Sequence, residues 1–360
     1  MKNKARINLR EIAEQCGVTR MAVSLALRNK PGVSEDTRKH VHTVAQKLGY
    51  TPDPEVAKLM SHIRVNAPAE AKACLALLTS GATAQEWMRS VTEQKYVEGS
   101  HARAREYGYR VENFWLNEPG LSPARLSSIL WNRGIEGIII APLQEALSGH
   151  QQRSVQLDFQ LFAVVEISET VESPDLDRAI HDQYTAMSKC LDELTTLGYQ
   201  SIGLVLEEAL DVRVNGKWTA AYLRHGQQNG SRNHPPPLIL PKLDQKAFSR
   251  WYDRHHPEAI VSVDRFGLRL LQGHGLKMPK DIGYASLDLD GDRTDFPGLS
   301  GIDQNSLLVG AAAVDMLVAA IQRGQRGIPD HPVRMEVEGT WTPGTSTIAK
   351  RRRPAAALRK

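Results

Sequence analysis

The sequence predicts an α/β protein in which a small helical N-terminal domain precedes a two-lobed body of doubly wound parallel sheets. Short amphipathic helices separated by a glycine-containing turn fill the chain up to about residue 50. From residue 74 onward, apolar strand-like segments alternate with helical segments. The length of 360 residues exceeds one ordinary domain, and 41% hydrophobic residues can form a large core.

Charge is distributed unevenly along the chain, although the net charge is only +4. Residues 1–64 carry 12 Lys and Arg against 6 Asp and Glu, and residues 349–360 carry 6 Lys and Arg with no acid. The segment between them holds 27 basic and 35 acidic residues. Two basic ends favour an anionic partner, whereas the acidic body is expected to have a different role.

Signals for membranes, secretion and disulfides are missing. The most apolar stretch, Gly310–Ile321, is shorter than a membrane span and is interrupted by Asp315, so no transmembrane helix is predicted. The basic N-terminus leads into charged residues, so no signal peptide is predicted. Three cysteines far apart in the sequence indicate reduced thiols: Cys16, Cys74 and Cys190. A cytoplasmic protein is therefore expected.

No metal site, cofactor site or catalytic site is predicted. The adjacent His255 and His256 have no partner at metal-ligand spacing and are interpreted as a solvated pair. The sequence contains neither a GxSxG nucleophile motif nor a GxxxxGK(S/T) phosphate loop. Gly273 and Gly275 form too short a fragment to indicate a dinucleotide site.

The first two predicted helices are separated by a short turn. Leu9, Ile12 and Ala13 share one face of the first helix, and Gly17 can adopt the left-handed conformation that ends it. Thr19 is a good N-cap for the second helix. The apolar stripe of that helix is formed by Ala22, Val23, Ala26 and Leu27. This arrangement predicts a helix-turn-helix.

A third helix is predicted over Glu35–Leu48, with Ser34 as its N-cap and Gly49 at its end. The outward residues of the second helix have two interpretations. They form either the solvated face of a generic bundle or a surface that enters the DNA major groove. Under the second interpretation, Arg20 can pair with guanine, whereas Met21 can make only apolar contacts.

This N-terminal segment resembles the DNA-binding headpiece of the LacI/GalR family of bacterial transcription regulators. The stretch 8–29 carries the resemblance, and 33–38 and 48–52 continue it in order. The resemblance implies base contacts from Arg20 and Met21, with Leu25 facing the groove. Together with the outward face of the second helix, it gives the following set of DNA-binding candidates in the headpiece: Thr19, Arg20, Met21, Ser24, Leu25, Arg28, Ser34, Thr37 and Tyr50.

A short hinge helix is predicted after the headpiece. Asp53 is a suitable N-cap and Pro54 a suitable first helical residue. The segment 54–62 is too short to be stable alone in water. The resemblance implies that such a helix folds on DNA and places Leu59 as a wedge in the minor groove. The alternative is that its apolar residues pack against the core or a partner chain.

The body repeats the pattern of helix, glycine, short loop and apolar strand. Helices are predicted over 92–107 and 122–132, and strands over 74–79, 109–115, 137–141, 201–206 and 282–287. The strands are apolar on both faces, as sheets covered on both sides require. Further stretches resemble the body of the family, in the same order along the chain: 133–142, 181–203, 213–216, 259–264 and 278–282. That body is similar to periplasmic sugar-binding proteins, which hold small polar ligands between two lobes.

Ligands of open α/β sheets bind outside the carboxyl ends of the strands. Arg213 is expected there, at the start of the helix that follows the strand ending at Leu206. Arginine and acids in one cleft suit a polyol, because each hydroxyl needs a donor and an acceptor. Adding what the resemblance implies, the effector-binding candidates are Ser80, Glu166, Arg213, Asp264, Asp288 and Gln304. Each carboxylate alone could equally cap a loop or be solvated.

Four parts are predicted: a DNA-binding headpiece over residues 1–52, a hinge helix and linker over 53–70, an effector-binding and dimerisation core over 71–348, and a basic disordered tail over 349–360. The tail is interpreted either as a solubilising segment or as a source of salt-sensitive DNA affinity. The predicted protein is a homodimeric repressor that binds double-stranded operator DNA and responds to a small-molecule effector, expected to be a sugar.

A second function class stays open at this point. The chain could be a sugar-binding or glycoside-processing protein without a gene-regulatory role. Asp288 and Asp290 would then supply the acid pair of a hydrolase. A DNA-reading headpiece has no purpose in such an enzyme, so the sequence favours the regulator, with no enzyme activity, cofactor, metal or membrane partner.

Overall fold

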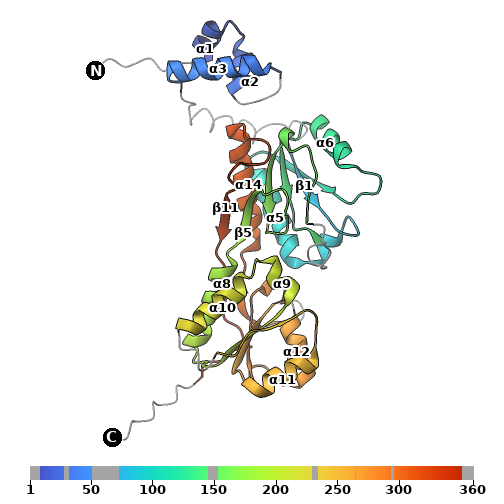
Figure 1. The fold of residues 1–360 in the computed structure, drawn as a ribbon, viewed down its shortest axis with the longest axis vertical. Coiled ribbons are helices and arrows are strands. Elements are labelled where there is room, and N and C mark those ends of the chain that lie inside the picture. Colours follow the sequence, from blue (N-terminus) through green and yellow to red (C-terminus); the bar gives the residue numbers. More distant parts are fainter. Residues whose placement is uncertain are drawn as a thin grey trace, which may run out of the picture.

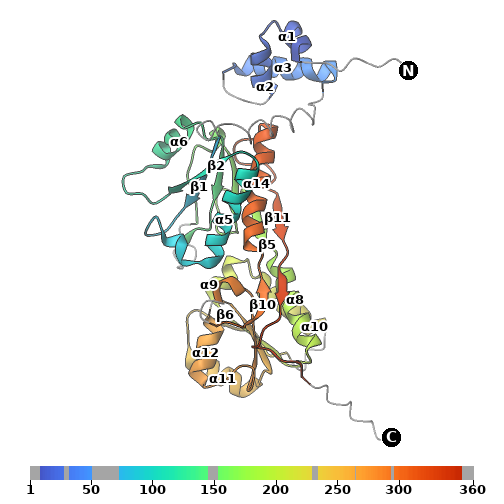
Figure 2. The ribbon, with the colours of Figure 1, turned by 180° about the vertical axis from the view of Figure 1, so that it is seen from behind.

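A computed structural model describes residues 9–27, 32–50, 73–144, 153–228, 234–263, 265–292 and 296–350. An N-terminal helical unit is followed by two lobes, each built on a six-stranded sheet (Figures 1 and 2). The predicted α/β class with two doubly wound sheets is confirmed. The predicted hinge helix lies outside the described residues.

The helical unit contains α1 (Leu9–Cys16), α2 (Arg20–Leu27) and α3 (Glu35–Leu48), as predicted. Gly17 has a φ of 66°, and the Thr19 hydroxyl oxygen accepts the backbone N–H of Ala22 at 3.1 Å. Ser34 caps α3 by accepting the Thr37 backbone N–H at 3.2 Å. The fully buried core residues come from all three helices: Ile12, Val23, Ala26 and Val41. Local capping and apolar spacing therefore suffice to specify this unit.

The first lobe, here called the N-lobe, has a parallel sheet in the order β11-β5-β4-β3-β1-β2. Its strands are β1 (Cys74–Thr79), β2 (Arg110–Trp115), β3 (Gly137–Ile140), β4 (Ala163–Ile167), β5 (Asp177–His181) and β11 (Arg334–Val337). One face packs on α5 (Val91–Glu106) and α14 (Ser306–Arg323), and the other on α6 (Pro123–Asn132). Two short 3-10 helices complete it, η2 (Glu86–Arg89) and η3 (Phe159–Leu161).

The second lobe, here called the C-lobe, has the sheet order β12-β10-β9-β8-β6-β7. Its strands are β6 (Ile202–Glu207), β7 (Leu238–Leu240), β8 (Ala259–Ser262), β9 (Gly283–Ser286), β10 (Ser300–Asp303) and β12 (Thr340–Thr342). Its helices are α8 (Gln183–Thr196), α9 (Glu208–Arg213), α10 (Lys217–Gln228), α11 (Gln245–His255), α12 (Phe266–His274) and α13 (Leu289–Asp292). α8 and α10 cover one face, and α11 and α12 cover the other.

Two strands, β2 and β12, differ from the strands expected from the sequence. β2 is an exposed or half-buried edge strand rather than a strand buried on both faces, and it carries Arg110 and Glu112. β12 pairs with β10 in the antiparallel direction. Both strands lie at sheet edges, where one side has no neighbouring strand and polar side chains can reach water.

Three described segments connect the lobes: β5 leads into α8, β10 leads into α14, and β11 leads into β12. They are bonded to one another. The Asp182 backbone N–H donates to the Val337 carbonyl at 2.9 Å, and the Asn305 side-chain amide donates to the Glu338 carbonyl at 2.7 Å. The segments therefore form a common hinge along one side of both lobes (Figures 1 and 2).

α14 is the one helix, within the described ranges, that is long and apolar enough to cross a membrane. Half of this window is buried, and the helix packs between α5 and the N-lobe sheet. Its apolar residues include Val309, Ala313 and Leu317, all fully buried in that core. The apolar stretch noted in the sequence is thus the core helix of the N-lobe.

Candidate DNA interface and effector site

The outward face of α2 presents the residues expected to read bases. Arg20 and Met21 lie in its first turn and are exposed, Met21 by 67% of its surface. A methionine exposed at this position is accessible for apolar contact with a thymine methyl group. Ser24 and Leu25 are half-buried further along the helix. The N-terminal end of a helix that projects these side chains is the geometry used in the major groove.

Among the other DNA-binding candidates, Thr19 and Ser34 lie at helix N-termini. Thr19 is exposed before α2, and Ser34 is exposed before α3. The Ser34 and Thr37 hydroxyl oxygens are 2.8 Å apart, so one of the two hydroxyl protons is left to donate elsewhere. Tyr50 is half-buried against the headpiece core. Two further candidates, Arg28 and Leu59, lie outside the described residues.

A small cavity of about 20 Å³ lies between the lobes, lined by Tyr96 of α5, by His181 and Gln183 of the first connection, and by Arg213. Arg213 is the last residue of α9, not the start of a helix as the sequence analysis expected. The six-residue helix α9 lies between β6 and α10. Arg213 therefore ends this short helix instead of beginning a longer one. No hydrogen bond or ion pair joins its guanidinium to another described residue. It is therefore a free donor group at the cavity.

The same cavity holds two buried acceptors without partners. The Nε2 atom of His181 and the Oε1 atom of Gln183 lack hydrogen-bond partners among the described residues. Burial lowers the pKa of His181 to about 4, so its ring is neutral at pH 7. Its Nδ1 atom lies 3.0 Å from the Val337 carbonyl and must donate to it, which leaves Nε2 as an acceptor. These acceptors and the Arg213 guanidinium belong to residues that line one cavity, and hydroxyl groups need both acceptors and donors.

Glu93 and Gln144 add further polar groups from the N-lobe. The Gln144 side-chain amide donates to the Glu93 carboxylate at 2.5 Å, and its backbone N–H donates to the Ser80 hydroxyl at 2.8 Å. Burial raises the pKa of Glu93 to about 7, while the Gln144 hydrogen bond and the charge of Arg213 act in the opposite direction. Glu93 lies in the first turn of α5, on the carboxyl side of β1.

The remaining effector candidates are divided between several places. Asp288 follows β9 and accepts a hydrogen bond at 2.7 Å from the hydroxyl of Thr92 on the N-lobe. Gln304 is buried in the second connection and donates to the Leu287 carbonyl at 2.9 Å. Ser80 lines a separate cavity of about 160 Å³ between the strand ends and α6. Asp264 lies outside the described residues.

Two family models match the chain. Residues 8–53 match the model of bacterial regulatory proteins of the lacI family. Residues 191–347 match that of the periplasmic binding protein-like domain. The first match covers the helix-turn-helix, and the second covers most of the C-lobe. The chain therefore combines a helix-turn-helix domain of the lacI family with a periplasmic binding protein-like domain.

Curated relatives are transcriptional regulators. The regulator GntR of Escherichia coli K12 is 27% identical over 224 residues, which are 60% of this chain and 60% of GntR. The regulator MalR of Streptomyces coelicolor is 26% identical over 337 residues, 87% of this chain and 90% of MalR. Both relatives are named as transcriptional regulators, which favours the regulator over the hydrolase alternative.

Solved structures share the LacI-family fold. A complex of the regulator CelR with cellobiose superposes with a TM-score of 0.55 at 19% identity, covering 95% of this chain and all of that chain. The lac repressor dimer bound to operator and to the anti-inducer ONPF gives 0.53 at 18% identity, covering 96% and 100%. At such identities the likeness concerns the fold alone.

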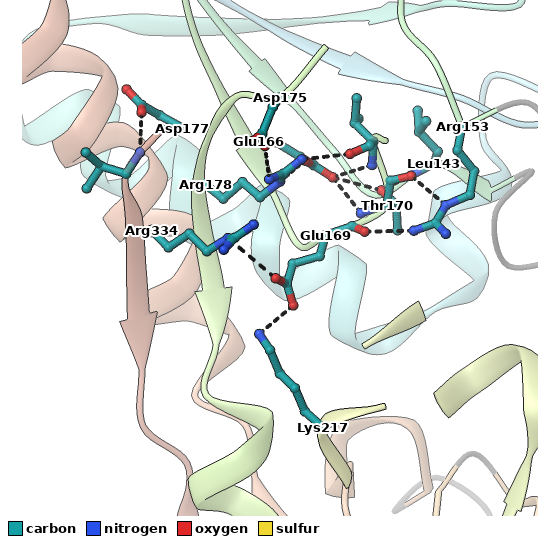
Figure 3. Close-up of polar contacts among 12 residues, drawn as sticks. Leu143, Arg153, Glu166, Glu169, Thr170, Asp175, Asp177, Arg178, Lys217 and Arg334 are labelled. Atoms are coloured by element: carbon teal, nitrogen blue, oxygen red, sulfur yellow. Dashed lines mark hydrogen bonds and ion pairs between the residues drawn. The ribbon is translucent and has the colours of Figure 1, made fainter. Parts of the chain in front are cut away.

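Glu166 has a different environment from that expected of an effector contact (Figure 3). It is fully buried, and its Oε1 atom accepts the backbone N–H groups of Thr170 at 2.6 Å and Val171 at 2.7 Å. Its Oε2 atom accepts from Arg178 Nε at 2.7 Å. The Glu166 carboxylate therefore holds the loop that follows β4.

The sequence analysis missed four residues of the interlobe region: Glu93, Gln144, His181 and Gln183. Glu93 could have been found, because the first turn of a helix after a strand lies at the carboxyl edge of the sheet where ligands bind. His181 and Gln183 flank the first connection between the lobes, and no local pattern marks such a crossover.

Proposed function

We propose that this LacI-family chain is a sequence-specific DNA-binding repressor whose operator affinity is controlled by a small polyhydroxylated effector, a sugar, bound between the lobes. The observation that carries the effector part is the cavity lined by Arg213, His181 and Gln183, where the guanidinium, the His181 Nε2 atom and the Gln183 Oε1 atom have no hydrogen-bond partner among the described residues. The exposed Arg20 and Met21 on α2 support the DNA part.

A neutral ligand fits the charges of the cleft better than an ionic one. The acids around it are mostly held by partners from the opposite lobe: Glu169 by Lys217, Asp290 by Lys95, and Asp288 by Thr92. An additional ammonium group would meet acids that are already paired, and a carboxylate would pair with Arg213 but would also lie beside these acids. Hydroxyls need only hydrogen bonds. Cellobiose in the CelR complex is a ligand of this class.

The assembly and domain division follow from the same proposal. Residues 1–52 act as the headpiece, 53–70 as hinge and linker, 71–348 as the effector-binding and dimerisation core, and 349–360 as a basic tail. Two copies related by a two-fold axis present two α2 helices to the two halves of a pseudo-palindromic operator. The protein works on DNA in the cytoplasm. The lac repressor, which shares this fold, is bound to its operator as a dimer.

Arg20→Ala is expected to weaken binding to the selected operator by about 5- to 150-fold, because a bidentate arginine–guanine contact is worth about 1–3 kcal/mol. The operator is first selected from genomic fragments by gel shift at physiological salt. Lys47→Ala is the matched control, since it removes one positive charge from the exposed end of α3. It should weaken all sequences equally. An Arg20→Ala protein with unchanged discrimination, or a wild type that selects no fragment, would overturn the proposal.

Arg213→Ala is expected to abolish the thermal shift produced by the best ligand in a panel of neutral mono- and disaccharides and sugar acids. The reason is that Arg213 is the free donor of the cavity. Arg254→Ala, which removes an exposed arginine from α11, is the control and should keep the full shift. A full shift in the Arg213→Ala protein contradicts the site, and a strong preference for sugar acids contradicts the neutral ligand.

A further inference from the structure

The side chain of Glu169, in the loop that follows β4, contacts the C-lobe. The Glu169 carboxylate lies 2.6 Å from the ammonium group of Lys217, the first residue of α10 (Figure 3). Glu169 is 8% exposed and the Lys217 side chain 24%, so the pair is largely shielded from water. Their other charged neighbours are more distant: Arg334 is 3.6 Å from Glu169, and Glu336 is 3.9 Å from Lys217.

This loop is held in place on several sides before Glu169 reaches the C-lobe. Arg153 donates to the Glu169 carbonyl at 2.9 Å and to the Thr170 carbonyl at 3.0 Å. Glu166 accepts the backbone N–H groups that follow, as described above. Ser168 has a φ of 80°, a conformation that non-glycine residues adopt only when their surroundings enforce it. Glu169 is thus presented in a fixed position, which lowers the entropy lost when it pairs with Lys217.

A second set of contacts joins the lobes through α5. Thr92 donates to Asp288, and Lys95 pairs with Asp290, which is 4% exposed. The cavity of about 20 Å³ that Glu169 and Arg213 help to line has room for about one water molecule and not for a sugar ring. In this arrangement the lobes are therefore too close together for a sugar ring to fit between them.

We propose that the ion pair between Glu169 and Lys217 is a latch that holds the lobes shut without effector and thereby sets effector affinity. The effector part rests on the proposed function, whereas the latch itself concerns the free protein. A ligand that binds only the open arrangement has its affinity reduced by the fraction of molecules that are open. Releasing the latch raises that fraction.

The latch is tested by the distance between spin labels placed across the mouth of the two lobes. Ser128 and Arg269 are exposed residues of α6 and α12. These two helices lie on the side away from β11 in both views (Figures 1 and 2). Both residues are replaced by cysteine in full-length protein, with Cys16→Ser because Cys16 is not buried. Without any ligand, Lys217→Met and Glu169→Gln should each shift the distance distribution to longer values.

Arg133→Met is the matched control, because it breaks an exposed ion pair with Glu112 that lies within the N-lobe. It should leave the distances unchanged. Distances identical to wild type in both the Lys217→Met and Glu169→Gln proteins overturn the latch. If circular dichroism shows that one variant does not fold, the distances measured in the other variant decide. Glu169→Gln is expected to fold because it keeps the size of the side chain.

Effector binding supplies a second, separable readout. With the best sugar of the panel, Lys217→Met should lower the dissociation constant by about three- to tenfold, the range expected when a partly buried ion pair stops holding the closed state. Longer distances with no sugar bound by any protein leave the latch standing and contradict the proposed function. Unchanged sugar affinity together with longer distances contradicts the link between latch and affinity.

Discussion

Replacing Arg178 with methionine is expected to lower the free energy of unfolding by about 3–5 kcal/mol, the range for breaking a buried ion pair from one side. The Arg178 and Glu166 side chains are only 6% and 0% exposed and are joined at 2.7 Å. Without Arg178, the Glu166 carboxylate keeps its buried position and loses its only cationic partner there. Urea denaturation followed by circular dichroism measures the change.

The double variant Glu166→Gln with Arg178→Met separates the loss of charge pairing from a general packing defect. It removes the buried charge and keeps an oxygen for the N–H groups of Thr170 and Val171, so much of the stability should return. Arg133→Met breaks an exposed ion pair and should lower the free energy of unfolding by at most about 1 kcal/mol. An Arg178→Met protein as stable as wild type would contradict the role assigned to the pair.

The same variant should respond to pH. Burial already raises the pKa of Glu166 to about 7, and loss of Arg178 raises it further. A carboxyl group whose pKa is higher in the folded state than in the unfolded state binds more protons when folded, so its contribution to stability grows as pH falls. The deficit of Arg178→Met relative to wild type should therefore be largest well above pH 7 and shrink as the pH falls toward 7. Below pH 7 it should level off, because the carboxyl group is then protonated in both folded proteins.

Gly310→Ala is the second substitution with a large expected effect. A Cβ atom on Gly310 of α14 would lie 2.1 Å from the Tyr96 carbonyl oxygen on α5, and one on Gly99 would lie 2.0 Å from the Leu307 carbonyl oxygen. At these glycines the backbones of α5 and α14 are in direct contact. Backbone atoms, unlike a side chain, cannot rotate away from an added methyl group. Overpacking of this kind costs about 1–3 kcal/mol or more, which outweighs the gain of about 1 kcal/mol from helix propensity.

Thermal and urea unfolding measure this effect, with Ala319→Gly as a comparison on the same helix. Ala319 is half-buried, so its replacement should cost about 1 kcal/mol through helix propensity alone. Gly310→Ala has the opposite propensity change and should still be the more destabilised protein. A Gly310→Ala protein more stable than wild type would contradict the close packing of α5 and α14.

The sequence predicted those features that depend on neighbouring residues in the chain. Thr19 and Ser34 were recognised as caps because a hydroxyl before an apolar periodic segment satisfies backbone N–H groups of the next turn. β1 was found with its bounds because Cys74–Thr79 is a short, almost entirely apolar run, as a strand covered on both faces requires. Neither inference needed contacts between distant segments.

The candidate effector site was predicted less completely because it depends on contacts between lobes. Glu166 was interpreted as a ligand contact because it ends a strand, yet its partner Arg178 lies on the next strand of the sheet. Glu169 gave no signal in the sequence, since its partner Lys217 is 48 residues away. Arg213 was recognised as a candidate, but its place at the end of α9 depends on a short helix that the pattern did not show.

The central claim is that an effector between the lobes changes the affinity of the headpiece for DNA. The most direct test measures the dissociation constant for the selected operator at fixed salt, with and without a saturating amount of the best sugar of the panel. Coupling free energies of about 1–3 kcal/mol predict a change of about 5- to 150-fold, which Arg213→Ala should abolish. A sugar that stabilises the protein against heat but leaves operator affinity unchanged would contradict the account.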